Sequence, residues 1–572
     1  MDNHAVARVL GEIADLLELK DENPFKIRAY RNGADIVANH PHDLSKLDAL
    51  ALRGIPGIGR DLAARIREIA DTGDADVHRQ LVAEFSPTVL DLLHLQGVGH
   101  KTVAVLYREL GVRTLDDLDL AAADGRVRAL RGMGEKKESL IRKAIADRKR
   151  NLGRHLLPHA HEAAAAIVGA LHEQLPGASV TVVGSVRRGC ESCGDLDLLA
   201  SGPPGPLIEA LIGHRLVERV LEGGETKSSV LLKGGFQADL SIVPEESRGA
   251  ALQYFTGSKG HNIALRNRAI RMSLELNEYG VFRADDGHQV AGATEEEVYD
   301  ALGLAWIPPE LREDRGELGA AEARLLPRLI NRADLRGDLH VHTTESDGKD
   351  DLAAMVDAAG QAGLEYLAIT DHSKALMMAN GLDEHRALAH AERVRALDGR
   401  GGVRLLAGIE CDIKADGSLD LDDECLAALD IVVASVHSGF DQDREQMTDR
   451  LLRAIGNRHV DILGHPTGRR ILRREPYALD IDRVLQAAER HGVALEINSQ
   501  VDRLDLSDAH AKLARELGVG LVISSDAHSR DAFARLRWGV VVARRAWVEP
   551  GDVLNTRGFE AFRASLRRNR SL

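Results

Sequence analysis

The chain contains little cysteine and few aromatic residues. Its 572 residues include four cysteines, and phenylalanine, tryptophan and tyrosine together make up 3% of the composition. Four cysteines in a chain of this length are too few for a disulfide framework, which indicates a reducing compartment. Because aromatic side chains are scarce, the hydrophobic cores must be built mainly from Ala, Leu, Val and Ile.

Long apolar runs are also missing. Among the longest is 163–171, which is far short of the roughly 20 residues that a membrane-spanning helix needs. Acidic residues stand at Asp2, Glu12 and Asp15, where a signal peptide would be basic and then apolar. The composition is that of soluble globular proteins, and a prior of roughly 150 residues per domain predicts about four domains. We therefore expect a soluble, cytoplasmic, multidomain protein with no membrane partner.

The chain has no excess of positive charge. Its 74 Lys and Arg residues against 89 Asp and Glu residues give a net charge of −15, which argues mildly against a nucleic-acid partner. However, residues 1–150 carry 24 of each sign, and 126–150 holds ten basic residues against three acidic ones. That segment predicts a locally basic face. The acidic surplus elsewhere has two interpretations, a solvated surface or carboxylates gathered around metal ions.

A Gly-x-Gly unit recurs three times in the first 150 residues, at 55–59, 95–99 and 130–134. Its glycine pairs are Gly57 and Gly59, Gly97 and Gly99, and Gly132 and Gly134. Each unit leads into an amphipathic stretch, which predicts two helices joined by a tight turn. Such a turn lets a phosphate approach the free N–H groups of the next helix without any reading of base sequence. For one copy, glycines that merely cap helices explain the pattern equally well; three copies favour DNA-backbone binding. The units resemble helix-hairpin-helix motifs.

Strand-like apolar runs begin after residue 150. They occupy 180–183, 196–199, 230–232 and 240–243 and alternate with predicted helices at 161–175 and 207–221. This pattern predicts an α/β or α+β domain with a small sheet. After residue 335, apolar strands at 367–370, 403–407, 431–435, 461–463, 493–497 and 521–524 alternate with helices such as 352–360 and 481–490. Repeated strand–helix units predict a parallel, barrel-like sheet.

A first group of candidate catalytic residues lies in the small sheet. Asp195 and Asp197 alternate along a strand, so both side chains point to one face, and Asp239 begins a later strand. Three converging carboxylates suit two Mg²⁺ ions shared with substrate phosphates, and Asp239 could accept the proton of an attacking hydroxyl. An Asp-x-Asp pair alone is usually a solvated strand end. The preceding Gly184-Ser185 makes the pattern far more specific, since a triphosphate could rest on nearby backbone N–H groups.

This stretch resembles the nucleotidyltransferase palm of the DNA polymerase X family. The resemblance covers residues 1 to about 318 and includes the opening 23–30, the segment 254–258 and the thumb signature 277–280. It implies nucleotide contacts by Gly184, Ser185, Arg188, Gly194, Tyr254, Phe255, Gly257, Ser258 and Asn262, and a DNA contact by Arg266.

Two positions depart from that family's pattern. Members with lyase activity use a lysine where this chain has Arg65, and a guanidinium stays protonated and cannot form a Schiff base. Lyase activity at that site is therefore in doubt, although Arg65 could still hold a 5′-phosphate. Cys190 and Cys193 form a Cys-x-x-Cys pair with no second cysteine pair nearby, so we interpret them as loop residues rather than as a zinc or redox site.

A second group of candidate residues follows the strands of the predicted barrel. It consists of His340, His342, Asp347, His372, Glu410, His437, His465, Asp526 and His528. The carboxyl ends of barrel strands converge on one rim, where active sites lie. A single histidine at a strand end is more often a hydrogen-bonded structural residue, but this many in register with the strands indicate a metal site. Mixed imidazole and carboxylate ligands suit Zn²⁺, Mn²⁺ or Fe better than Mg²⁺ alone.

This pattern resembles the PHP family of metal-dependent phosphoesterases over residues 336 to about 545, which implies three metal ions, Mn²⁺ or Zn²⁺. The resemblance implies three ligand sets: His340, His342, Glu410 and Asp526; Glu410, His437 and His528; and Asp347, His372 and His465.

Both groups in one chain resemble a bacterial DNA polymerase X with a fused PHP domain. The expected fold is multidomain α and α/β, with a distorted (β/α)7 PHP barrel at the C-terminus. The expected domains are a helical DNA-end-binding domain (1–80), a helix-hairpin-helix fingers-like domain (81–150), palm (151–258), thumb (259–318), linker (319–335) and PHP phosphoesterase (336–572).

The expected function is a monomeric repair polymerase that adds deoxynucleotides, from their triphosphates, to a primer 3′ end in gapped or nicked DNA. The PHP domain would act as a 3′–5′ exonuclease, with 3′-phosphatase and abasic-site endonuclease activities left open. One alternative is a phosphoesterase for a small substrate with a relic polymerase half; another is a non-catalytic DNA-end scaffold. The intact metal-ligand residues in both groups count against these alternatives.

Overall fold

The computed structural model describes residues 3–39, 44, 47–55, 57–85, 88–93, 95, 98–151 and 153–569. The chain forms two compact units, 1–152 and 153–572. No helix within the described ranges combines the length and the apolar character that crossing a membrane requires.

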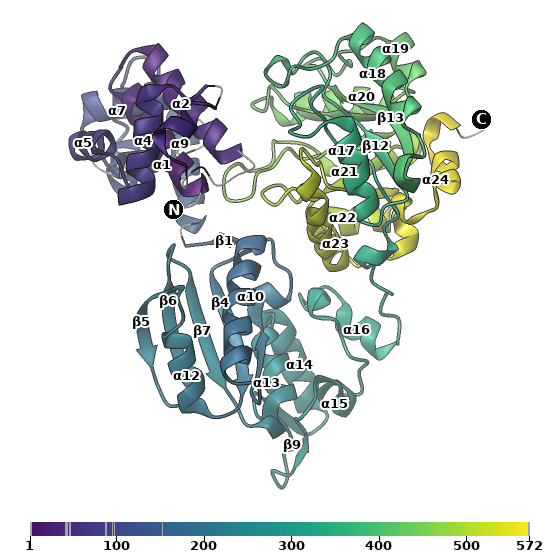
Figure 1. Cartoon of the computed structure of the whole chain (residues 1–572). Coiled ribbons are helices and arrows are strands. Elements are labelled where there is room, and N and C mark those ends of the chain that lie inside the picture. Colours follow the sequence, from purple (N-terminus) through teal and green to yellow (C-terminus); the bar gives the residue numbers. More distant parts are fainter. Residues whose placement is uncertain are drawn as a thin grey trace. The chain divides into compact units, whose positions relative to one another are not determined.

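The described part of the first unit is helical (Figure 1). Its helices are α1 Asn3–Leu19, α2 Pro24–Asn39, α3 Ala49–Leu52, α4 Arg60–Thr72, α5 Asp76–Phe85, α6 Val89–Leu93, α7 His100–Leu110, α8 Leu115–Ala123 and α9 Glu135–Asn151. Helix α1 lies at the centre, because its buried residues Val6, Leu10, Ile13 and Leu17 recur every three or four positions and form one apolar stripe. This stripe belongs to a single core shared with the helices around it.

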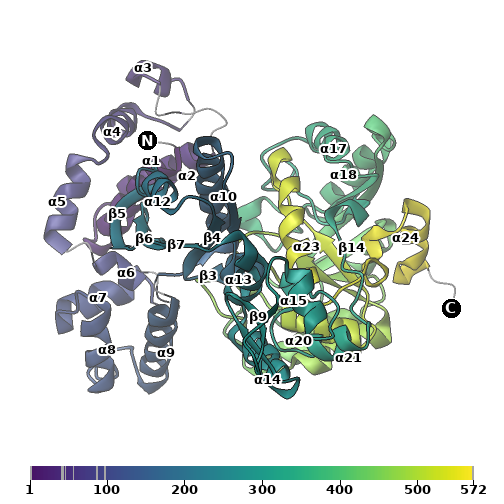
Figure 2. The ribbon, with the colours of Figure 1, turned by 90° about the horizontal axis from the view of Figure 1, so that it is seen from below.

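The second unit begins with the palm sheet, whose strand order is β2-β4-β7-β6-β5. The strands are β2 Ser179–Val182, β4 Asp195–Ser201, β5 Val217–Gly223, β6 Lys227–Leu232 and β7 Gln237–Ile242. The helices of this region are α10 Leu157–Gln174, α11 Gly184–Arg187, α12 Pro204–Ile212 and α13 Arg248–Thr256, and β1 His155–Leu156 pairs with β3 Ser192–Cys193. Figure 2 shows α12 against the strands from a second direction. Strands β4 and β7 are parallel, which sets their carboxylates side by side.

One sequence prediction in the palm is wrong. A helix was expected over 207–221, whereas α12 ends at Ile212 and Val217–Gly223 forms the edge strand β5. Helix α12 ends at Ile212, directly before Gly213. Strand β5 is largely exposed, so its mixture of charged and apolar residues gives no clear pattern of burial from which a strand could be predicted.

The thumb follows with α14 Lys259–Arg271, the antiparallel strands β8 Leu274–Asn277, β9 Gly280–Arg283 and β10 Gln289–Ala291, then α15 Glu295–Ala301 and α16 Glu317–Glu322. Its core includes Ala321 and Leu329, so the stretch expected as a linker packs against the thumb.

The barrel contains seven parallel strands in chain order. They are β11 Gly337–Asp338, β12 Tyr366–Ile369, β13 Arg404–Asp412, β14 Ile431–Ser435, β15 Ile462–Leu463, β16 Ala494–Asn498 and β17 Leu521–Ser524. Its helices are α17 Leu352–Gln361, α18 Glu384–Ala396, α19 Asp423–Ala428, α20 Arg444–Gly456, α21 Ile481–His491, α22 Asp508–Glu516, α23 Leu536–Arg545 and α24 Phe559–Ser565. A parallel bridge between Val341 and Ala527 brings the first and last strands together. The carboxyl ends of all strands therefore face one rim, as the sequence predicted.

Candidate active sites

The three palm aspartates lie together. Asp197 on β4 pairs in register with Asp239 on β7, and Asp195 lies two residues before Asp197 on the same face. One carboxylate oxygen from each residue falls within 4.8 Å of the other two, so the three could share a divalent ion. The pair Asp195 and Asp197 therefore meets Asp239, as expected from the sequence.

The surroundings of these carboxylates favour a cation. Burial, reinforced by the charges of Asp195 and Asp239, raises the pKa of Asp197 to about 6. The Gln237 side-chain amide donates to both oxygens of Asp239 at 3.0 Å and fixes that carboxylate. Gly184 has a φ of +64°, and a Cβ there would lie 2.0 Å from an Asp197 oxygen, so only glycine allows this approach.

Arg188, expected to bind a triphosphate, is held by protein groups. Its Nε donates to Glu313 at 3.0 Å, and its guanidinium also donates to the Thr256 carbonyl. Arg545 from α23 donates to the same Glu313 oxygen at 2.9 Å. Gly257 adjoins this group, since a Cβ there would lie 3.1 Å from Arg188 Nη1. A phosphate would therefore have to compete with Glu313 for Arg188.

The remaining expected nucleotide residues gather where α13 meets α14. Tyr254 and Phe255 end α13 with their rings 5.3 Å apart, and the Ser258 hydroxyl caps α14 by accepting from His261 N–H. Asn262 donates to the Tyr254 carbonyl at 2.7 Å, which ties the two helices together. Ser185 lies on α11, while Gly194 and Arg266 are exposed.

Of the two cysteines expected in a loop, Cys190 lies in one, whereas Cys193 belongs to the short strand β3, which pairs with β1. Both thiols are free, and burial raises the pKa of Cys193 to about 11 and raises that of Cys190 as well. Thiols held protonated in this way are poor nucleophiles and poor metal ligands.

All nine expected barrel residues converge on one cavity of about 330 Å³ or border it, eight of them after the ends of strands and Glu410 within β13. The carboxylates are strongly acidic: despite burial, the neighbouring histidines lower the pKa of Glu410 and of Asp526 well below their ordinary values. The histidines differ. Burial lowers the pKa of His342 to about 4, whereas Glu410 overcomes burial and raises the pKa of His372 to about 10.

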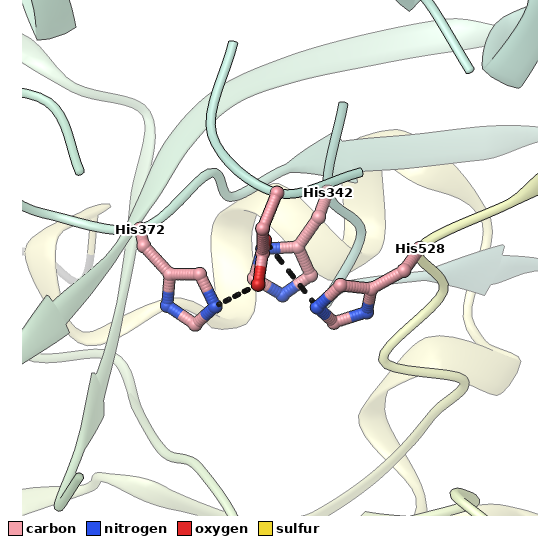
Figure 3. Close-up of side chains that lie close together, drawn as sticks. His342, His372 and His528 are labelled. Carbon is pink, nitrogen blue, oxygen red and sulfur yellow. Dashed lines mark ion pairs between the residues drawn. The ribbon is translucent and has the colours of Figure 1, made fainter. Parts of the chain in front are cut away.

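The structure corrects two members of the expected ligand sets. His528 Nε2 lies 3.4 Å from Asp347 and shares a group with His342 and His372, whose rings Figure 3 shows gathered together. His465 Nε2 lies 3.0 Å from Glu410, not in the Asp347 group. His465 and His528 therefore exchange places.

Barrel closure explains the exchange. Because β17 meets β11, the residue following β17 reaches the ligands that follow β11 and β12. Strands β14 and β15 are neighbours in the sheet. His437 follows β14 and His465 follows β15, so both histidines lie in the same part of the rim. His437 Nε2 also lies 3.3 Å from Glu410.

Several polar atoms of this cluster are buried without a hydrogen-bond partner in the described structure. They include His340 Nε2, both ring nitrogens of His342, His372 Nδ1, His465 Nδ1 and Glu410 Oε2. Leaving buried polar atoms unpaired is unfavourable, and the named nitrogens of His340, His342 and His372 lie 2.7–3.9 Å from carboxylate oxygens. The donor set therefore fits divalent metal ions, which would satisfy such atoms together.

Two residues that the sequence interpretation missed support the ligands. Glu496, fully buried on β16, accepts from His340 Nδ1 at 2.8 Å and from the His465 backbone N–H at 2.7 Å. Asp412 lies 3.4 Å from His437 Nδ1. Carboxylates of this kind fix the orientation of ligating imidazoles. The available signal was a glutamate within the apolar run 493–497.

Backbone strain also marks the cluster. His465 and Asp526 have φ values of 27° and 51°, a region that residues with a side chain rarely adopt. Such strain concentrates at functional sites, where the surrounding structure maintains it.

In the first unit, the described glycines agree with tight turns before helices. Gly57 and Gly132 have φ values of +88° and +80°, and Gly59 and Gly99 are extended residues that begin α4 and α7 without a side-chain cap. The first N–H groups of those helices therefore have no capping side chain. Gly134 directly precedes α9, and Gly97 lies outside the described residues.

Arg65 lies on α4 and pairs with Glu68. This hydrogen bond raises the pKa of Arg65 above its ordinary value, so the guanidinium keeps its proton. That agrees with the expectation that Arg65 forms no Schiff base.

Known families match successive parts of the chain. These are a helix-hairpin-helix domain (residues 1–75), a SAM-like helix-hairpin-helix tandem (89–147), the DNA polymerase beta palm (158–232), the DNA polymerase beta thumb (251–313) and the PHP domain (338–500).

Similar proteins match either the whole chain or its C-terminal part. The DNA polymerase/3′-5′ exonuclease PolX of Bacillus subtilis (strain 168) is 37% identical over 573 residues, which covers 100% of both chains. A probable phosphatase of Thermoanaerobacter sp. (strain X514) is 33% identical over 231 residues, 38% of this chain and 89% of that protein. Another, from Shewanella sp. (strain MR-4), is 35% identical over 203 residues, 33% of this chain and 75% of that protein.

Proposed function

The chain belongs to the PolX family of DNA polymerase/3′-5′ exonucleases, and from this premise we propose how its residues divide the two activities. It is a DNA polymerase and 3′–5′ exonuclease with a polymerase beta palm and thumb and a PHP domain. The observation that carries the division is the presence of two separate groups of metal-ligand side chains, one of carboxylates alone and one rich in histidine.

In the palm, we assign metal binding to Asp195, Asp197 and Asp239, with Mg²⁺ as the ion. Asp239 accepts the proton of the primer 3′-hydroxyl, and the Gln237 amide holds the Asp239 carboxylate in position. Divalent ions, when bound, lower the pKa of the attacking oxygen and neutralise charge on the leaving group in both sites.

The triphosphate of the incoming nucleotide lies against Ser185, Arg188 and the backbone at Gly184 and Gly194. The triphosphate replaces Glu313 as the ion-pair partner of Arg188, because it carries more negative charge and can accept two hydrogen bonds from the guanidinium. Tyr254, Phe255, Gly257, Ser258 and Asn262 form the wall that faces the nucleotide sugar and base, and Arg266 contacts DNA.

In the barrel, we assign three ions, Mn²⁺ or Zn²⁺, to sets that follow the distances in the structure. The sets are His340, His342, Glu410 and Asp526; Glu410, His437 and His465; and Asp347, His372 and His528. The reaction is hydrolysis at a DNA 3′ end; 3′-phosphatase and abasic-site endonuclease activities use the same chemistry. The probable phosphatases that resemble this region support phosphoester hydrolysis.

The first unit grips the DNA backbone through its glycine turns and the basic residues of 126–150, of which Arg131, Lys136, Arg142 and Lys143 are exposed. The substrate is a gapped or nicked duplex, bound by a monomer in the cytoplasm. Replacing Arg142 and Lys143 by Gln should reduce the slope of log affinity against log salt by about 2, measured by fluorescence anisotropy. An unchanged slope would place the DNA elsewhere.

The domain boundaries expected from the sequence are kept as the proposed division of functions: DNA-end binding (1–80), helix-hairpin-helix fingers-like (81–150), nucleotidyl transfer (151–258), thumb (259–318), a connecting stretch that packs against the thumb (319–335) and hydrolysis (336–572).

The direct test uses a 5′-labelled primer in a gapped duplex with Mn²⁺, with and without deoxynucleotides. Asp195→Ala should lose extension and keep shortening, whereas His340→Ala should lose shortening and keep extension. Loss of both activities in either variant would contradict two independent sites.

A further inference from the structure

The metal cavity of the barrel has a cationic wall whose role no ligand assignment explains. Besides members of the metal-ligand cluster, the cavity is lined by Arg470, Gln500 and Arg503. All three residues belong to the loops that follow β15 and β16.

The two arginines differ in how their charge is used. Arg470 Nη1 lies 2.7 and 2.6 Å from the two oxygens of Asp502, so its charge is neutralised by the protein. Arg503 is 13% exposed, and within the described residues its guanidinium donates no hydrogen bond. Its nearest carboxylate is Asp526, with 3.9 Å between Arg503 Nε and Asp526 Oδ2. A guanidinium has five N–H donors, and leaving them unpaired at a largely buried position is unfavourable unless a ligand uses them.

The backbone of Arg503 is held by hydrogen bonds, although its guanidinium has only the long ion pair with Asp526. Its N–H donates to the Gln500 carbonyl at 2.9 Å, and its carbonyl accepts from Arg469 Nε at 3.0 Å. The next residue, Leu504, is fully buried and has a φ of 42°. A strained, tightly bonded segment that presents to the cavity a guanidinium with only one long ion pair, to Asp526, is arranged for an anionic ligand.

Metal ions held by Asp526 would share its charge, so that Asp526 would then compete less for Arg503. The group left to pair with Arg503 is a phosphate oxygen of the substrate, and a guanidinium matches a phosphate in a bidentate manner. Building on the proposed exonuclease function, we propose that Arg503 binds a non-bridging oxygen of the scissile phosphodiester, and afterwards the phosphate of the nucleoside 5′-monophosphate product.

In this hydrolysis the oxygen of a water molecule bonds to phosphorus, the water loses a proton, and the P–O3′ bond breaks. The electron pair of the broken bond goes to O3′, which takes up one proton in exchange for the one that the water loses. The products are a 3′-hydroxyl and a nucleoside 5′-monophosphate. Arg503 keeps all its protons and stabilises the negative charge that increases on the phosphate oxygens.

The test compares Arg503→Gln and Arg503→Lys in the full Mn²⁺-loaded chain, with Arg470→Gln as the matched control from the same cavity wall. Arg503→Gln should lower kcat/KM for shortening of a 5′-labelled single strand by about 100-fold, the range seen when one charge-stabilising donor is removed. Arg503→Lys should recover part of the loss. Primer extension and the bound Mn²⁺, measured by atomic emission, should stay at wild-type levels.

A binding measurement gives a readout that does not depend on turnover. Titration calorimetry with inorganic phosphate should show at least about 10-fold weaker binding for Arg503→Gln and little change for Arg470→Gln. Wild-type shortening and wild-type phosphate binding in Arg503→Gln would overturn the inference, as would loss of Mn²⁺ from that variant, which would indicate a structural role. If the wild-type chain shortened no DNA, the proposed exonuclease would be wrong, and the phosphate titration would still decide the role of Arg503.

Discussion

The palm and the barrel build metal sites in opposite ways. The palm offers three carboxylates, of which Asp195 is exposed, and leaves the rest of the coordination to water and substrate phosphates. The barrel places nine ligand residues around one cavity, buries most of them and supports His340 and His437 with further carboxylates. The palm group therefore offers few protein ligands for a metal ion, whereas the barrel group gathers nine candidate ligands within the protein.

This difference predicts different consequences when a ligand residue is lost. In an open site without metal ions the carboxylates repel one another, so removing one carboxylate should stabilise the folded protein. In a buried mixed site the carboxylates and histidines already attract one another, so removing a carboxylate leaves buried imidazoles without partners.

The largest effect should come from central ligands. Asp239→Asn should lower primer extension by about 1,000-fold or more and leave shortening intact, because it removes one charge from the palm site alone. Glu410→Gln changes a residue that lies within 4 Å of five histidines, and it should do the reverse. Gel assays of both reactions on one labelled primer measure this double dissociation. A parallel loss of both activities in either variant would show that the two sites are coupled.

Removal of metal ions should lower the thermal stability of the barrel more than that of the palm. Chelation should lower the melting temperature of the barrel by several degrees, since ligand binding stabilises by about 4 kcal/mol at 1,000 times Kd, and should change the palm much less. Differential scanning calorimetry with and without chelator measures this. His342→Ala, which removes a central ligand, should weaken the response; an equal response in that variant would place the stabilising ions elsewhere.

A smaller effect should follow from the support of His340. Glu496→Gln should reduce exonuclease kcat and metal affinity by about 10- to 100-fold, because the carboxylate that orients the imidazole loses its charge. Glu496→Asp should recover part of the metal affinity, measured by competition with a chromogenic chelator. Extension should be unaffected, and a decrease there would mean that the substitution disturbs more than the barrel.

The smallest effect concerns pH and the palm. The pKa of Asp197 rises from its ordinary value of 3.8 to about 6 in the folded protein. The stability that its protonated form provides is fully present below pH 3.8 and is lost as pH rises through about 6. Asp197→Asn should therefore raise the melting temperature of the metal-free protein at pH 7.5 and have little effect at pH 4. The exposed thumb residue Asp285 is a control, since Asp285→Asn should shift neither value. A stabilisation that is equal at both pH values would contradict the ionisation argument.

The sequence predicted most of the barrel because most of its buried parallel strands are short apolar runs, and five of the seven (β11, β12, β14, β15 and β17) are followed by a candidate ligand residue. The predicted run 431–435 coincides with β14, and 521–524 coincides with β17. The edge strand β5 was missed because an exposed strand lacks a burial pattern. In the palm, alternation along β4 was enough to place Asp195 and Asp197 on one face.

Taken alone, the sequence determined which residue types stand at strand ends and turns, because these depend on local periodicity and on backbone freedom. It could not determine which ligands share an ion, since that depends on closure of the barrel between β11 and β17, which moves His528 to Asp347 and leaves His465 with Glu410. Nor could it show that Glu313 holds Arg188, or that Arg470 is neutralised while Arg503 is not. Those facts depend on distances between side chains far apart in the chain, and only the packing of the folded protein sets such distances.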